Sequence, residues 1–195
     1  ATLDPSLVAL EAGTHSPWIS AALEGWGHTV LVANPAELAA ITRSKKKTDS
    51  RDARMLAKLA RVEPELLCPL RHRPAQAQTD LALIKARHAL VKVRATLIGH
   101  CRGIVKSAGA RLPACSADCF HRRAQEAVPT SLREALEPLV RQVGELSEKI
   151  WGLEHKIEAL AKQRYAEHER LTAVGSVGRL TALCHLCPGH CSACE

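Results

Sequence analysis

The sequence is poor in aromatic residues and has no long apolar run. Only 3% of the 195 residues are aromatic, although 46% are hydrophobic, mostly Ala, Leu and Val. This composition excludes a disordered chain and favours helices over a β-sandwich or barrel. No apolar run approaches the roughly 20 residues that a membrane-spanning helix needs, and no secretory signal pattern opens the chain, so we expect no membrane association.

Methionine occurs only once, at Met55, and the cysteines are not spaced as they are in small secreted proteins. Ala1 is therefore not a natural start, and we interpret the chain as processed or as a piece of a longer protein. Four of the eight cysteines lie in the last twelve residues, which is not the framework of a small disulfide-bonded domain. We expect a reducing, cytoplasmic location.

Acidic residues are missing from one long stretch. No Asp or Glu lies between Leu81 and Ala117, whereas seven Lys and Arg residues do, and the whole chain has a formal net charge of +7. Such a basic balance favours nucleic acid or another anionic surface as a partner.

The first 70 residues alternate between strand-like and helix-like patterns. Residues 7–10 and 29–32 are short apolar runs typical of buried strands. Ser16-Pro17 and Asn34-Pro35 are helix-start signals that follow these runs. The β-α-β-α order predicts an α/β part with a parallel sheet and covering helices.

A basic loop at residues 42–48 leads into a helix that begins near Asp49 and continues to about Arg61. Three prolines between residues 64 and 74 then mark an irregular connection. We therefore expect the first domain to span residues 1–70.

Two long helices are predicted in the region 76–165. The first covers about residues 76–106 and is basic, and a loop at about 113–129 follows it. In the second, apolar residues alternate steps of four and three without a miss, which predicts a coiled coil that pairs within the chain or with another subunit. This seam consists of Leu132, Leu136, Leu139, Val143, Leu146, Ile150, Leu153, Ile157 and Leu160.

Three carboxylates stand at positions where a metal site is expected. Asp49 and Asp52 are three residues apart at the start of a helix, so both project from its first turn. Glu11 follows a predicted parallel strand, at the edge where α/β sheets place their sites. Such a set suits Mg²⁺ or Mn²⁺. The alternative is that Asp49 caps the helix and Asp52 stabilises the positive end of its dipole.

The sequence around these residues closely resembles the N-terminal half of the DEDD-type insertion-sequence transposases, relatives of the pilin-gene-inverting recombinase. The resemblance rests on Glu11-Ala12-Gly13-Thr14, Gly27-His28-Thr29-Val30, Ala33-Asn34-Pro35 and Lys47-Thr48-Asp49-Ser50-Arg51-Asp52-Ala53-Arg54. It implies a partial RuvC-like, ribonuclease-H-type fold in which Glu11, Asp49 and Asp52 are catalytic metal ligands.

Two parts of the family pattern do not match. The family's first aspartate lies on a strand upstream of the residues present here, and the serine that takes part in strand exchange belongs to a second domain whose motif is absent. We therefore expect the polypeptide, expressed as it stands, to bind nucleic acid with strong salt dependence but neither to cleave nor to join DNA.

The region 170–195 resembles the start of that second domain. Residues 171–183 match a helix-hairpin-helix-like motif in which Gly178 would help to hold a DNA phosphate, although Ser176 stands where a glycine is usual. A plain turn between helices is the alternative. The cysteine-rich tail can be interpreted as a zinc site or as an out-of-frame ending, and its short spacing favours the latter.

The resemblance implies DNA transposition and recombination, with transposon ends, target DNA and a guide RNA as partners, in a bacterial, nucleoid-associated homo-oligomer. Nucleic-acid contacts would come from a basic segment by charge rather than base reading. Its residues are Lys45, Lys46, Lys47, Arg51 and Arg54. The alternatives are a nucleic-acid-binding remnant without catalysis and a coiled-coil assembly protein.

Overall fold

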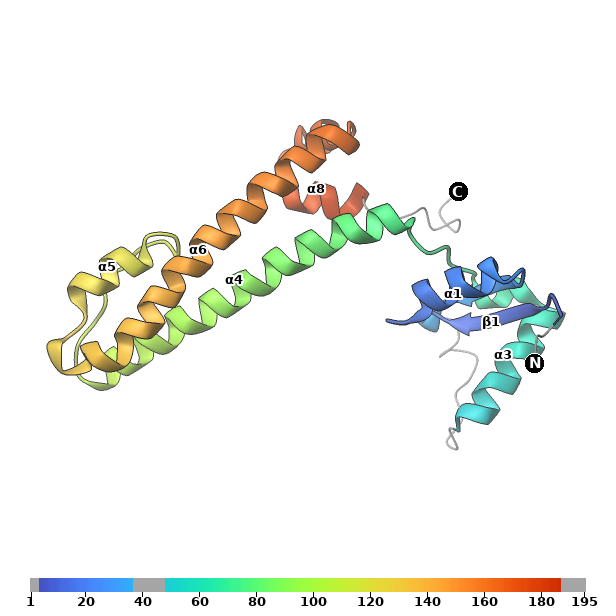
Figure 1. The fold of residues 1–195 in the computed structure, drawn as a ribbon, viewed down its shortest axis with the longest axis horizontal. Helices are drawn as coiled ribbons and strands as arrows, with labels where there is room; N and C mark the ends of the chain where they lie inside the picture. Colours follow the sequence, from blue (N-terminus) through green and yellow to red (C-terminus); the bar gives the residue numbers. More distant parts are fainter. Residues whose placement is uncertain (1–3, 37–47, 187–195) are drawn as a thin grey trace. The chain divides into compact units, whose positions relative to one another are not determined.

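The computed structural model describes residues 4–36 and 48–186, which form two compact units (Figure 1). The first unit ends at Pro74 and the second begins at Ala75. Within the described ranges, no helix is long and apolar enough to cross a membrane.

The first unit contains a small parallel sheet. Strand β1 (Leu7–Glu11) pairs in parallel with β2 (Thr29–Ala33), and helix α1 (Ser16–Gly25) connects them. This confirms the predicted β-α-β order and the parallel pairing. The described sheet has two strands, so the larger ribonuclease-H-type fold stays a prediction.

The turn that leads from β1 into α1 is held by a serine side chain. The Ser16 hydroxyl donates to the Gly13 carbonyl at 2.8 Å and accepts from the Gly13 N–H at 2.9 Å. The Ser16-Pro17 start signal places the N-cap at Ser16, but the helix begins at Ser16 itself and its N-cap is His15, one residue earlier. Gly27 ends the connection with φ of 87°, a conformation that glycine adopts without steric strain.

A helical start follows β2, as expected: Pro35 and Ala36 are helical, and the Asn34 side-chain oxygen accepts from the Ala36 N–H at 3.1 Å. The continuation of this helix and the basic loop at 42–47 lie outside the described residues. Helix α3 (Asp49–Val62) comes next and leads through a 3₁₀ turn (Pro64–Leu67) to an isolated antiparallel bridge between Leu70 and Val32.

The second unit is helical. Its elements are α4 (Ala75–Ser107), α5 (Phe120–Ala127), α6 (Thr130–Arg164), α7 (His168–Thr172) and α8 (Arg179–Leu186). Helices α4 and α6 lie side by side and run in opposite directions (Figure 1), so the two predicted long helices pair with each other in one chain.

The apolar seam of α6 faces the interior of this unit. Leu136, Val143, Leu146, Ile150 and Ile157 are buried, and the other four seam residues are half-buried. The pairing of this seam within the chain is thus observed, whereas supercoiling of the two helices stays a prediction.

Helix α5 corrects one expectation, because residues 113–129 were predicted to be a loop. Phe120 and Ala124, four residues apart, are both 1% exposed and pack in the same cluster as Val140 and Val143 of α6. With only two core residues, the helix is too short to show a helical period in the sequence. It forms because the α4–α6 pair offers an apolar surface that covers both.

Polar contacts join α4 to α6 and its neighbouring residues at three positions along α4. Near the start of α4, the Asp80 carboxylate, 2% exposed, accepts hydrogen bonds from Arg164 at 2.8 Å, Tyr165 at 2.9 Å and Gln76 at 3.0 Å. Further along α4, Arg87 forms an ion pair with Glu154 of α6. Still further along, the guanidinium of Arg94 donates to Asp118 at 2.6 Å and to Ser147 at 3.0 Å.

We expect Leu146→Ala or Ile150→Ala to lower the free energy of unfolding by about 2–5 kcal/mol, because each truncation removes buried contacts and leaves a cavity. Leu146 is 5% exposed and Ile150 is 2% exposed. Urea unfolding followed by circular dichroism measures the change. Lys149→Ala, at an exposed position of the same helix, is the control and should change stability little. A loss no larger than that of the control would contradict the burial of the seam.

Asp80 makes stability depend on acid pH. Burial raises the pKa of its carboxyl, but hydrogen bonds from Gln76, Tyr165 and Arg164 and the charge of Arg164 outweigh burial and hold the pKa below the ordinary 3.8. A carboxyl whose pKa is lower in the folded state stabilises fully above pH 3.8, and this contribution is lost as pH falls through the folded value.

We therefore expect Asp80→Asn to lower the free energy of unfolding at pH 7 by about 1.5–3 kcal/mol, since it removes hydrogen bonds to a charged acceptor. The difference between wild type and variant should shrink as pH falls below 3.8. Urea unfolding from pH 7 to pH 3 tests this, with the exposed Glu134→Gln of α6 as control. A difference that stays constant down to pH 3 would contradict the role given to the Asp80 charge.

Candidate metal and nucleic-acid site

Glu11 lies on the sheet face that α3 covers. Side chains two apart on a strand share a face, so Glu11 is on the same side of β1 as Ala9. Ala9 pairs with Leu31, and Glu11 pairs with Ala33 of β2. Ala9, Leu31 and Ala33 all pack in the cluster that contains Leu56 of α3.

Asp49 and Asp52 continue the packed stripe of α3 toward its start. Leu56 is four residues after Asp52 and seven after Asp49, so the three side chains share one face of the helix. Leu56 and Ala60 are buried, Asp52 is half-buried and Asp49 is exposed. The stripe that packs on the sheet therefore changes from apolar to acidic in the first turns of α3.

By strand register and helix spacing, the three carboxylates thus belong to the layer on the α3 side of the sheet, where Glu11 and Asp49 are exposed and Asp52 is half-buried. The structure does not bring the three carboxylates close enough together to form a metal site. In residues 4–36 and 48–186, no group of three His, Cys, Asp or Glu side chains is close enough together to hold a metal ion. They share a layer rather than direct contact.

The capping interpretation of Asp49 is wrong. Thr48 is the residue before the helix, with extended φ and ψ of −143° and 141°, and its carbonyl accepts from the N–H groups of Arg51 and Asp52 at 3.0 Å. Asp49 is the first helical residue, and the Thr48 side chain forms no capping hydrogen bond. Both aspartates are in the first turn, where a negative charge interacts favourably with the positive end of the helix dipole.

Two of the predicted nucleic-acid-binding residues are on α3. Arg51 and Arg54 are three residues apart, exposed, and form no ion pair within the part of the chain that the structure describes. Lys45, Lys46 and Lys47 lie outside the described residues. The two arginines place positive charge on α3 beside the carboxylates without neutralising them.

The predicted hairpin near Gly178 is a helix–turn–helix. Helices α7 and α8 contact each other, and Gly178 directly precedes α8, where its carbonyl accepts from the Ala182 N–H at 3.0 Å. Ser176 has φ of 78°, a left-handed conformation that favours glycine, which explains why a glycine is usual there. Gly178 itself has open space, since an added Cβ would meet only the Thr181 hydroxyl at 4.0 Å.

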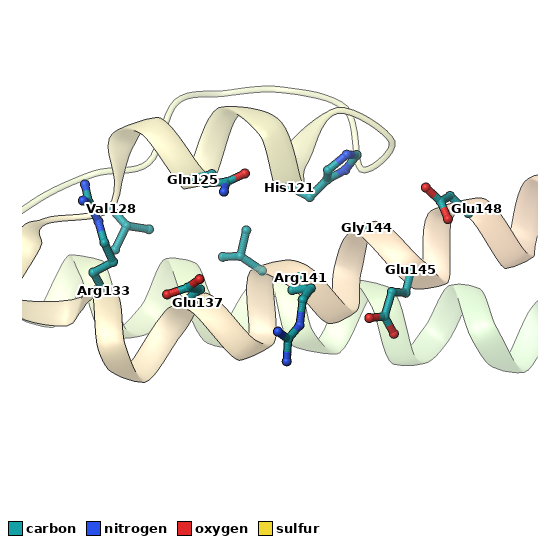
Figure 2. A pocket seen from close by; sticks show the side chains of 10 residues that line it. His121, Gln125, Val128, Arg133, Glu137, Arg141, Gly144, Glu145 and Glu148 are labelled. Carbon is teal, nitrogen blue, oxygen red and sulfur yellow. The ribbon is translucent and has the colours of Figure 1, made fainter.

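The structure also shows a groove between α5 and α6 that the sequence did not indicate (Figure 2). Its volume is about 450 Å³, and its lining includes His121, Arg141 and Glu148. The His121 ring extends from α5 over Gly144, where an added Cβ would lie 3.3 Å from the ring. The His121 Nδ1 is buried and has no hydrogen-bond partner among the residues that the structure describes. The sequence feature that could have indicated the groove is Gly144, a glycine inside a long helix.

The comparison with protein families identifies the chain. The model of the IS110-type DEDD transposases, described as "Transposase", matches residues 1–109. The match covers more than half of the chain, which therefore belongs to this transposase family. It includes β1, α3 and α4 but not Gly178. No curated protein matches the chain.

Proposed function

We propose that the chain acts in DNA transposition through a divalent-metal site formed by Glu11, Asp49 and Asp52. Family membership supports the transposition function. The observation that carries the site is the shared layer: Glu11 lies on the sheet face covered by α3, and both aspartates lie on the stripe of α3 that packs there.

The donor set fits Mg²⁺ or Mn²⁺, because both ions prefer hard carboxylate oxygens. When bound, such an ion activates an attacking water or hydroxyl and stabilises the leaving oxygen of a phosphodiester. The chain's own residues hold and orient the ion: Glu11 from the rigid end of β1, and Asp49 and Asp52 from one helical turn. Arg51 and Arg54, with Lys45, Lys46 and Lys47, hold the phosphates of the DNA strand beside it.

The wider assembly is part of the proposal. The bound DNA would comprise transposon ends and target, paired with a guide RNA, and the active form would be a homo-oligomer. Because the α6 seam is filled by α4 of the same chain, a second copy would have to use outer faces of the hairpin. Trp151, 64% exposed on α6, is one such position.

A second candidate function is nucleic-acid binding without catalysis. It is favoured by the finding that no three potential ligands gather within the described ranges. Robust Mg²⁺-dependent strand cleavage that Asp49→Ala abolishes would exclude this candidate, whereas salt-dependent DNA binding with neither cleavage nor Mn²⁺ binding at Asp49 and Asp52 would support it.

The metal site is tested by measuring Mn²⁺ binding to the full chain by electron paramagnetic resonance. Asp49→Asn and Asp52→Asn each remove a proposed ligand, and even an outer partner of a metal ligand is worth about 10–100-fold in affinity. We therefore expect each variant to weaken binding at least about tenfold.

The matched controls are Glu63→Gln and Glu65→Gln, which remove exposed carboxylates of the same unit outside the proposed site. They should leave the affinity for Mn²⁺ unchanged. Equal losses in control and site variants would show general attraction of the cation by acidic side chains, and the proposed site would then be wrong.

A further inference from the structure

One flank of α4 carries a continuous row of exposed basic and small residues, here called the basic row. Its members alternate steps of three and four, so they follow one another along a single side of the helix. All seven are exposed. They are Lys85, His88, Lys92, Ala95, Gly99, Arg102 and Lys106.

The other cations of α4 behave differently. Arg87 and Arg94 are also seven residues apart, but they face α6 and the adjoining loop, where Glu154 and Asp118 neutralise them. The lysines of the basic row and Arg102 form no ion pair within the described ranges; Arg102 instead lies over the Phe120 ring, 5.6 Å from its centroid. The fold therefore uses two cations for its own stability and leaves a line of positive charge toward solvent.

We propose that the basic row binds the phosphate backbone of a DNA duplex, independently of base sequence. Lys85 and Lys106 are separated by 21 residues, or about 32 Å along a helix, which is close to one turn of B-form DNA. Phosphates along a duplex are a linear array of negative charge, so a straight line of unpaired cations complements it.

The composition of α4 argues against a single-stranded ligand and against reading of a base sequence. Proteins that hold single strands stack bases on aromatic side chains, and α4 contains no Phe, Tyr or Trp. Reading of adenine edges needs Asn or Gln, and the row has neither.

The choice of DNA over other polyanions rests on the proposed function in transposition. The row itself does not depend on the carboxylates of the first unit. If Mn²⁺ binding proves insensitive to Asp49 and Asp52 while the basic row binds duplex, the metal site fails and this inference stands. If Asp49 and Asp52 are needed for Mn²⁺ binding but the basic row does not bind duplex, the metal site stands and this inference fails.

The test compares two double variants of the full chain. Lys85→Gln/Lys92→Gln removes two charges seven residues apart from the basic row. Lys149→Gln/Lys156→Gln removes two exposed, unpaired charges of identical spacing from α6, within the described residues. Fluorescence anisotropy with a labelled 30-base-pair DNA, titrated from 50 to 300 mM NaCl, gives affinity and salt slope, and thermal unfolding confirms that both variants fold.

We expect the row variant to lose roughly 8-fold in affinity at 0.1 M salt if one lysine contacts a phosphate and roughly 60-fold if both do. The salt slope should fall by about 0.9 per lost contact. The α6 variant should bind like wild type. Equal losses in both variants would reduce the effect to net charge and overturn the proposal.

A substitution at Gly99 separates charge from shape. Gly99 occupies the same seven-residue register as the lysines, and apart from the backbone of its own helix no described atom lies within 4 Å of an added Cβ. Gly99→Glu and Gly99→Gln are nearly identical in size, and only the first places a negative charge in the row. We expect Gly99→Glu to bind DNA more weakly than Gly99→Gln.

Equal binding by the two Gly99 variants would contradict a phosphate contact along this flank. Tighter binding of a 30-base-pair RNA duplex or a single strand, lost in the row variant, would assign the row to that ligand instead. A row variant with unchanged DNA affinity but an altered oligomeric state by light scattering would assign it to a second copy of the chain.

Discussion

The close packing of α3 on strands β1 and β2 is the contact on which the proposed site depends. Ala9 and Ala33 are small, so Leu56 and Ala60 of the helix reach the strands, and Leu67 closes the cluster with no exposure. Because the helix lies so near the sheet, its first turns and the end of β1 border the same layer. A larger residue at Ala33 would lift α3 and move its aspartates farther from Glu11.

The second unit solves a different problem, namely how to keep two helices of more than 30 residues aligned. Apolar packing fixes the pair along most of its length, and buried polar contacts at Asp80 and Arg94 specify which residues meet. A buried charge left without its partner is unfavourable, so these contacts disfavour shifted pairings. The arginines that face inward also explain why only the other flank of α4 carries unneutralised charge.

Much of the fold could be predicted because it follows from short-range patterns. The strands were evident from apolar runs, the helix at Asp49 from its first turn, and the long helices from their periods. Helix α5 could not be predicted, since two buried residues establish no period. The role of Asp80 could not be predicted either, because its partners Arg164 and Tyr165 are more than 80 residues away in the sequence.

The candidate site was only partly predictable for a similar reason. Spacing put Asp49 and Asp52 on one helical face, and strand position put Glu11 at an edge, but neither pattern says which sheet face the helix covers. That depends on the register Ala9–Leu31 and Glu11–Ala33, which the structure supplies. The mistaken cap at Asp49 arose because Thr48 and Asp49 are both good capping residues, and the extended backbone at Thr48 decides between them.

The most direct test of this account is a crystal structure of the full chain soaked in Mn²⁺, with the ion located by anomalous scattering. The account predicts an ion between β1 and the start of α3, bound by a Glu11 oxygen and by Asp49 or Asp52 at about 2.0–2.6 Å. An ion bound elsewhere, or Glu11 on the sheet face away from α3, would contradict the claim that these carboxylates form one metal site.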